Sequence, residues 1–309
     1  MGSPQPFRSW RCFWRVMLGR LVVIEAPSNL GLKPARPGAV PGVRRLPEAL
    51  AAAGLRERLE APWVGRVVPP AYAPEVDPGT GIRNAPSIAR YSIELADAVE
   101  GAIGDGAFPL VLGGDCSILL GSLLALRRRG RRGLFFLDGH ADFASPATSP
   151  SHGAAGMDLA LATGRGPAEL SSLEGRGPLV RDEDVVLMGY RDDEVLPDRI
   201  SAYRVDRLRA VGIGGAVAGE VERLRSGGAQ GFWIHVDADV LDPSVMPAVD
   251  TPEARGLDPS ELVEILRGLL ASGLALGLQL CIYDPDLDPN GRCARCLVEI
   301  LTDAFASRA

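Results

Sequence analysis

The sequence predicts an α/β protein with a central, mostly parallel sheet flanked by helices. Short, uninterrupted apolar runs recur along the chain, as expected of strands that are buried on both faces. Segments with helical spacing of apolar residues lie between these runs. The chain also has 37 glycines and 25 prolines in 309 residues, which suits a fold with many strand–loop–helix junctions.

The predicted strands are apolar runs that precede loops rich in glycine, proline or aspartate. In chain order they are Leu21–Glu25, Pro109–Leu112, Gly133–Leu137, Asp184–Met188, Gly231–Val236 and Leu274–Ile282. The predicted helices carry apolar residues three or four positions apart. They are Glu48–Leu59, Ser87–Ile103, Ile118–Arg129, Ala216–Ser226 and Pro259–Ser272.

Residues 1–20 are predicted to be a poorly ordered extension, ahead of a single domain at residues 21–309. The extension carries four arginines and no acidic residue, and the arginines interrupt the apolar stretch that a signal peptide needs. A misassigned start codon and a surface-binding amphipathic helix are the alternatives. No apolar run is long enough to span a bilayer, and no break in composition marks a domain linker.

Charge and cysteine content exclude several classes of protein. The net charge of −6 argues against a nucleic-acid binder, whose surface is normally basic. Five scattered cysteines argue against a disulfide framework and indicate a reducing compartment, so a cytoplasmic protein is expected. The basic run at residues 127–132 is better explained as a solvated helix end. Cys293 and Cys296 lack the two further ligands of a structural zinc site and are interpreted as ordinary helix cysteines.

The strongest chemical signal is Asp138-Gly-His140-Ala-Asp142, directly after a predicted strand. In extended backbone alternate residues point to the same side, so both carboxylates and the imidazole can converge on one point. A second array, Asp237-Ala-Asp239, follows another predicted strand. The carboxyl ends of strands are where α/β sheets place their ligand sites.

A third loop, Gly113-Gly-Asp-Cys116-Ser, adds a potential thiolate ligand. A lone Asp-x-Asp after a strand is usually a turn or a helix cap. Three acidic loops at three strand ends are harder to explain as caps, because they would bring four carboxylates together without a counter-charge. The pattern therefore predicts a divalent metal site, and imidazole with carboxylates suits Mn, Fe or Zn.

In these motifs the chain resembles the ureohydrolase family, which includes arginase, agmatinase and formimidoylglutamase. The family patterns GGDHS, DAHxD and DxDxxDP are matched in order by Gly113–Ser117, Asp138–Asp142 and Asp237–Pro243. The similarity runs from about Leu21 to the C-terminus. It implies a three-layer, arginase-like fold.

The resemblance also implies a pair of Mn²⁺ ions and the ligands that hold them. Asp138 and Asp142 would bind one ion, His140 and Asp239 would bind the other, and Asp237 would bridge the two. Asp142 would also be catalytic, since in the family its equivalent hydrogen-bonds the bridging hydroxide. That metal-activated hydroxide would attack the amidino carbon of a linear guanidine or amidine.

One departure from the family concerns a metal ligand, because Cys116 stands where the family has histidine. A thiolate is softer than imidazole and is charged, so the preferred metal would shift from Mn toward Zn, Fe or Ni. Alternatively, Cys116 is a small buried thiol and a single ion binds tightly.

Other departures concern the substrate. The family's catalytic histidine aligns with Ala155, and His152, three residues earlier, is the candidate to replace it; the alternative is a surface-loop histidine. The family's guanidinium-binding glutamate aligns with Ile282. Glu194 and Asp284 are the candidate substrate-binding acids, although Asp284 also suits a solvated turn. Arginine itself is therefore a poor candidate substrate.

Taken together, the sequence predicts a metal-dependent hydrolase of non-peptide C–N bonds whose partner is a small guanidino or amidino molecule, with no nucleic acid and no membrane. By resemblance it is expected to form a homo-oligomer, a trimer or hexamer. The alternative is a catalytically silent, metal-binding homologue that acts as a structural or regulatory subunit. The lost histidines and glutamate favour this alternative, whereas the five retained ligands favour an enzyme.

Overall fold

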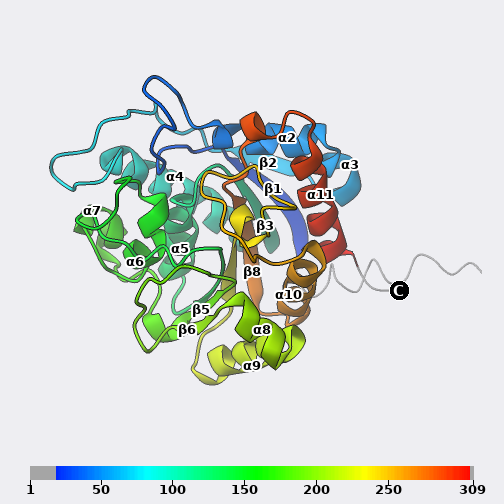
Figure 1. Cartoon of the computed structure of the whole chain (residues 1–309). Helices are drawn as coiled ribbons and strands as arrows, with labels where there is room; N and C mark the ends of the chain where they lie inside the picture. Colours follow the sequence, from blue (N-terminus) through cyan, green and yellow to red (C-terminus); the bar gives the residue numbers. More distant parts are fainter. Residues whose placement is uncertain (1–18, 307–309) are drawn as a thin grey trace, which may run out of the picture.

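A computed structural model describes residues 19–306 and contains one eight-stranded sheet (Figure 1). The strand order is β2-β1-β3-β8-β7-β4-β5-β6, and every neighbouring pair is parallel. The predicted α/β class with a parallel central sheet is therefore confirmed. The predicted extension falls almost wholly on residues 1–18, which lie outside the described residues.

The strands are short, and the central ones are buried throughout. Their bounds are β1 Arg20–Ala26, β2 Trp63–Arg66, β3 Ala107–Gly113, β4 Gly133–Leu137, β5 Val185–Met188, β6 Ser201–Tyr203, β7 Phe232–Asp237 and β8 Ala275–Cys281. The α-helices are α2 Leu46–Ala52, α3 Leu55–Leu59, α4 Ala85–Gly104, α5 Ile118–Arg128, α6 Asp158–Ala162, α7 Ala168–Ser171, α8 Val205–Val211, α9 Ile213–Ser226, α10 Pro259–Ala271 and α11 Arg292–Phe305. Six 3₁₀ turns join them: η1 Gly42–Arg45, η2 Ala155–Met157, η3 Leu173–Gly175, η4 Asp182–Asp184, η5 Ala238–Val240 and η6 Pro285–Leu287.

Helices cover both faces of the sheet, as continuous apolar strands require. Figure 1 shows α4 and α5 on one side of the sheet and α10 and α11 on the other. On the first side α4 packs against α5, β1 and β3, and on the second α11 packs against α10, α2 and α3. Within the described residues, no helix is both long and apolar enough to cross a membrane.

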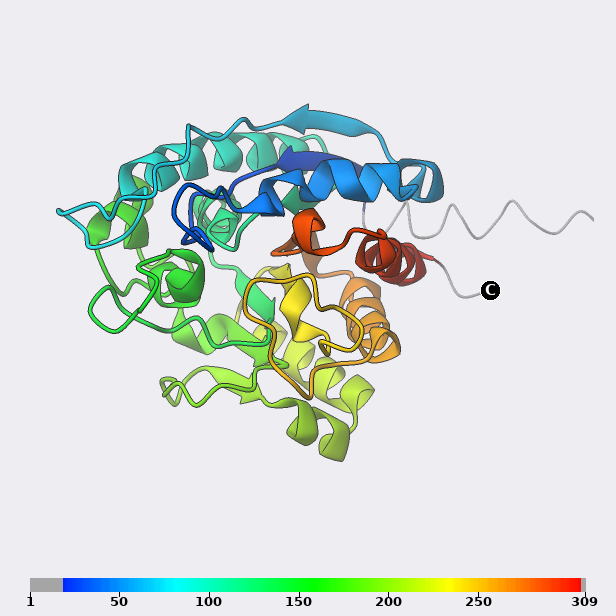
Figure 2. The same cartoon turned by 45° about the horizontal axis from the view of Figure 1, so that its top comes forward.

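The strand order determines which loops meet. Four adjacent strands, in the order β3-β8-β7-β4, have a candidate residue at or just after their carboxyl ends. Cys281 and Asp237 end β8 and β7, and Cys116 and Asp138 follow β3 and β4. Figure 2 shows the long loop between η5 and α10, coloured yellow to orange, on the face turned toward the viewer. Side chains far apart in the sequence therefore meet at one edge of the sheet.

One of the predicted helices is divided in the structure. The predicted helix Glu48–Leu59 is divided into α2 and α3, because Gly54 adopts a left-handed conformation with φ of 93°. The edge strands β2 and β6 were not predicted. Both are short, β2 is mostly exposed and β6 is half-buried, so neither has the continuous apolar run that marks the central strands.

Candidate metal centre

An open cavity of about 330 Å³ lies at the carboxyl ends of the central strands. Its described lining includes five of the six predicted metal ligands: Cys116, His140, Asp142, Asp237 and Asp239. The sixth, Asp138, is completely buried behind the cavity lining, and its Oδ1 lies 3.8 Å from Nδ1 of His140. The structure therefore brings all six residues together, as their positions after β3, β4 and β7 predict.

Asp138, His140 and Asp239 form one compact group whose ligand atoms lie within 4.8 Å of one another. His140 Nδ1 lies 2.9 Å from Asp239 Oδ2 and 3.8 Å from Asp138 Oδ1. Burial lowers the pKa of His140, but the hydrogen bond and charge of Asp239 outweigh burial and raise it to about 9. The same pairing lowers the pKa of Asp239, although burial acts in the opposite direction.

Asp237 and Cys116 form the neighbouring part of the site. Asp237 ends β7 and caps η5, where its Oδ1 accepts a hydrogen bond of 2.8 Å from the Asp239 amide. Its other oxygen, Oδ2, accepts a hydrogen bond of 2.8 Å from Cys116 Sγ. Burial, with a further contribution from Asp239, raises the pKa of Asp237. The Cys116 side chain thus points toward Asp237 in the candidate metal site, in the direction that the turn after β3 predicts.

Asp142 has a left-handed backbone conformation with φ of 47°, which is uncommon for a residue with a side chain. Such strain is found where the surrounding structure must hold a side chain in one direction. Burial and the nearby Asp138 raise the pKa of Asp142. Asp158, which is fully buried, lies within 4.8 Å of both Asp142 and Cys116.

The donor set fits a divalent cation. Asp138 Oδ2 is buried and has no hydrogen-bond partner among the described residues. A buried carboxylate oxygen of this kind costs free energy unless a proton or a cation satisfies it. Burial and the charge of Asp239 raise the pKa of Asp138, and a cation beside it would favour its charged form.

Arg191 supports the site from behind without lining the cavity. Its guanidinium donates to the backbone carbonyls of Asp239 at 2.6 Å and Val240 at 3.1 Å, and also to those of Gly189 and Glu253. The Arg191 amide donates to the Gly139 carbonyl at 2.8 Å. One buried cation therefore joins the two loops that carry the aspartate motifs.

The predicted substrate residues fall in different places. Glu194 lines the cavity, and its Oε2 accepts a hydrogen bond of 2.6 Å from the Phe143 amide. Burial raises the pKa of Glu194. Asp284 is absent from the described cavity lining; its carboxylate instead accepts hydrogen bonds from the amides of Gly42 and Asp286 and caps η6.

His152 also differs from the predicted arrangement. Its neighbours Ser149, Pro150 and Ser151 line the cavity, but the described lining does not include His152. Its Nδ1 lies 3.0 Å from the Gly81 carbonyl oxygen, which holds the ring against a different loop. A role for His152 as proton shuttle stays a prediction that this geometry does not support.

Three buried residues at the site were not predicted from the sequence: Asp158, His235 and Cys281. His235 precedes Asp237 by two positions on the same strand, so strand alternation places both on one face and could have revealed it. Cys281 ends an apolar run and Asp158 begins a short helix, and neither stands in a ligand-like spacing with another acid or histidine.

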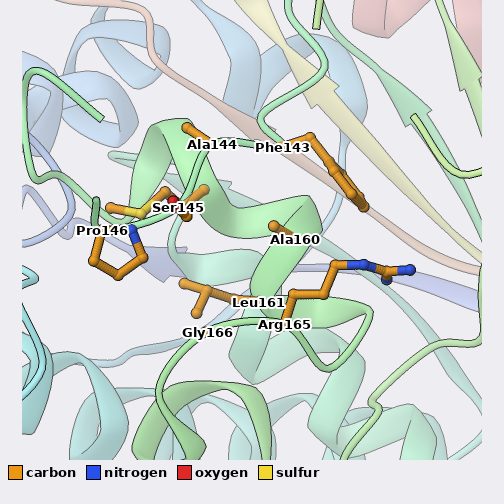
Figure 3. A pocket seen from close by; sticks show the side chains of 9 residues that line it. Phe143, Ala144, Ser145, Pro146, Ala160, Leu161, Arg165 and Gly166 are labelled. Atoms are coloured by element: carbon orange, nitrogen blue, oxygen red, sulfur yellow. The ribbon is translucent and has the colours of Figure 1, made fainter. Parts of the chain in front are cut away.

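A smaller cavity of about 120 Å³ adjoins the site and shares Ala144 with it (Figure 3). Arg165 lies over the ring of Phe143, with 4.9 Å between the guanidinium carbon and the ring centroid. Arg165 also makes two hydrogen bonds to Asp182, at 2.7 and 2.8 Å. These contacts fix the segment that follows Asp142.

Fold and site together define a ureohydrolase-type α/β protein, and comparisons with known proteins agree. The arginase family model matches residues 20–306. Arginase of Staphylococcus aureus (strain COL) is 31% identical over 297 residues, which cover 92% of this chain and 96% of that protein. The solved arginase of Bacillus caldovelox superposes with a TM-score of 0.82 at 28% identity, covering 94% of this chain and 99% of that one. The chain therefore belongs to the arginase family.

A more distant solved structure shares the fold alone. Proclavaminate amidino hydrolase from Streptomyces clavuligerus has a TM-score of 0.68 and 21% identity, with 92% of this chain and 90% of that chain covered. The three-layer, arginase-like architecture predicted from the sequence is thus confirmed.

Proposed function

We propose that this protein hydrolyses a non-peptide C–N bond in a linear guanidine or amidine with the help of bound divalent metal. One observation carries the proposal: the buried Asp138 Oδ2 has no hydrogen-bond partner among the described residues, although other carboxylates surround it. Such a cluster is stable when a cation neutralises it. Relatives named arginase support the guanidino class of substrate.

In this proposal Asp138, His140, Asp142 and Asp239 would hold the divalent ions, and Asp237 would contribute a further carboxylate. Divalent ions at such a site supply water of lowered pKa at neutral pH. Asp142 has a left-handed backbone and lines the cavity, so its carboxylate would be placed to hydrogen-bond and orient an attacking water. Manganese is the family expectation, and Cys116 makes zinc, iron or nickel the alternatives.

The acids of the cavity favour a cationic substrate. Asp192, Glu194 and Asp250 line the cavity beside the proposed ligands. Glu194 is the proposed contact for a substrate nitrogen, since the Phe143 amide holds its carboxylate in place. A planar guanidinium or amidinium matches two carboxylate oxygens through paired N–H donors.

A catalytically silent homologue is the second candidate, and the cavity wall favours it. Ala155 and Ile282 occupy the positions where the family has its catalytic histidine and its guanidinium-binding glutamate, and both line the cavity. Apart from His140, a proposed metal ligand, the described lining contains no imidazole. Homo-oligomeric assembly and a cytoplasmic location stay predictions from the sequence.

The deciding experiment is a substrate panel with purified protein supplied with Mn, Zn, Fe or Ni. Guanidines, amidines and formimino compounds should release urea, ammonia or formamide in the presence of at least one metal. Asp237→Asn should lower kcat/KM by more than roughly 10–100-fold, which is the loss typical when a residue that hydrogen-bonds to a metal ligand is replaced. Asp206→Asn, an exposed aspartate on α8, is the matched control and should keep full activity. Metal binding without turnover of any compound would favour the silent homologue.

A further inference from the structure

Two buried thiols meet beside the proposed metal site. Cys116 Sγ lies 3.1 Å from Cys281 Sγ and 2.8 Å from Asp237 Oδ2, and the cysteines are 1% and 0% exposed. Both cysteines are free thiols. Cysteine sulfur and a carboxylate oxygen at this spacing form part of a group that could hold a metal ion.

The sheet places these side chains together. Asp237 and Cys281 are direct partners in the parallel register of β7 and β8. On the other side of β8, Leu280 pairs with Leu112 of β3, four residues before Cys116. The three ligand atoms therefore come from three adjacent strand ends, which is a rigid support for a small site.

Hydrogen bonding determines how the nearby His235 takes part. The Trp233 indole N–H can only donate, and it donates to Gln279 Oε1 at 2.9 Å. The Gln279 amide nitrogen therefore donates to His235 Nδ1 at 2.7 Å, which leaves the hydrogen of the neutral ring on Nε2. His235 Nε2 lies 3.6 Å from Asp138 Oδ2 and 3.9 Å from Cys281 Sγ. His235 is thus a donor toward the site and not a ligand.

We propose that Cys116, Cys281 and Asp237 hold a thiophilic divalent ion, zinc or ferrous iron, with Cys281 as a second thiolate ligand. The inference rests on the proposed metal centre, because Cys116 and Asp237 belong to both. Two thiolates favour zinc or iron over manganese. Three protein ligands leave a fourth position open, and Cys116 and Asp237 line the cavity from which water or substrate would reach it.

The geometry requires a small adjustment on metal binding. Two sulfurs bound tetrahedrally at about 2.3 Å from one ion lie roughly 3.8 Å apart. The two thiols must therefore separate by less than about an ångström, which a side-chain rotation provides. The donor hydrogen on His235 Nε2 offsets part of the negative charge of two thiolates and one carboxylate.

The first test needs no variant. X-ray absorption on the reduced, full-length protein carrying one equivalent of zinc should show two sulfur neighbours at about 2.3 Å. One sulfur neighbour or none would overturn the assignment of Cys281 as a ligand. Zinc with only oxygen and nitrogen neighbours would overturn that assignment and still be compatible with the proposed hydrolase. A chain that binds no divalent ion would defeat both proposals, as would a Cys116–Cys281 disulfide that persists under reduction and excludes metal.

The second test uses cobalt, whose bonds to thiolate give charge-transfer absorption in the near ultraviolet. Cys281→Ser and Cys281→Ala should each reduce that absorption by about half, because one of two thiolates is lost. Cys296→Ser, which removes a thiol on α11 outside the site, should leave it unchanged. Asp239→Asn removes a proposed ligand outside the Cys116–Cys281–Asp237 group. It should weaken the binding of the other ion and leave the charge-transfer absorption unchanged. An absorption that survives both Cys281 variants overturns the inference.

Discussion

At the scale of single residues, the site depends on side chains that contact neither metal nor substrate. Arg191 is the strongest case, since its guanidinium donates to four backbone carbonyls on the loops around Asp239. Lysine keeps the charge but has a single donor group and no planar fork. Arg191→Lys should therefore lower metal affinity by roughly 10–100-fold while the fold persists.

Chelator competition measures that affinity, and circular dichroism checks the fold. Arg209→Lys is the matched control, because Arg209 pairs with Glu261 at the surface. It should leave metal affinity unchanged. Equal affinities for wild type and Arg191→Lys would show that Arg191 does not position the ligands.

At the scale of elements, the edge strand β6 is joined to α9 by one carboxylate. Glu220 accepts hydrogen bonds of 2.7 Å from both Ser201 and Tyr203, and it also pairs with Arg223. Burial raises the pKa of Glu220, but these donors outweigh burial and lower it. Glu220→Ala should reduce the free energy of unfolding by about 1–3 kcal/mol at neutral pH, because three donors lose their acceptor.

The sign of the pH dependence follows from the lowered pKa. A carboxyl whose pKa is lower in the folded state stabilises above its unfolded value, 4.5 for glutamate, and this contribution is lost as pH falls through the folded value. Urea unfolding of wild type and Glu220→Ala should therefore converge in acid. Glu222→Ala, an exposed neighbour on the same helix, should change stability by no more than about 0.5 kcal/mol. Curves for Glu220→Ala and wild type that stay parallel down to acid pH would contradict this account.

The elements also show what sequence alone can predict. The runs that became β4 and β7 are continuous and apolar, and alternation at their ends predicted that Asp138, His140 and Asp142 would converge. Cys281 was not predicted as part of the site, because its partners lie on other strands and only the strand order β3-β8-β7 brings them near. The spacing of residues in one segment predicts which of its side chains point the same way. Which segments become neighbours depends on the strand order, which local spacing does not give.

The same limit explains the residues whose placement differs. His152 was a candidate proton shuttle because it lies three residues before Ala155, with a surface-loop histidine as the alternative; its left-handed backbone with φ of 52° and the contact of its ring with Gly81 favour the alternative. The carboxylate of Asp284 is satisfied by the amide of Asp286 in its own loop and by the amide of Gly42 in η1. Loop conformation at such positions depends on tertiary contacts that the spacing of residues does not encode.

At the scale of the whole molecule, the buried acids link stability to metal and pH. In the metal-free protein the pKa values of Asp138, Asp142, Asp158 and Asp237 are raised above 3.8, mainly by burial. The pKa of His140 is raised from 6.5 to about 9. Between pH 6.5 and about pH 9 the folded chain therefore keeps a proton on His140 that the unfolded chain loses, so the contribution of this residue to stability falls as pH rises.

Bound metal should remove that penalty. With chelator present, the melting temperature should decrease from pH 6.5 to about pH 9, because the stability supplied by His140 is lost across this interval and the charged acids repel one another. Zinc or manganese at about 1,000 times its Kd should add roughly 4 kcal/mol, and the gain should be larger at high pH, where protons no longer compete for the ligands. Asp138→Asn should flatten the decrease and reduce the gain, whereas Asp206→Asn should keep both. A melting temperature that does not change when metal is added, or one that rises with pH in chelator, would show that these acids do not share a cation. Either result would contradict the proposed metal-dependent hydrolase.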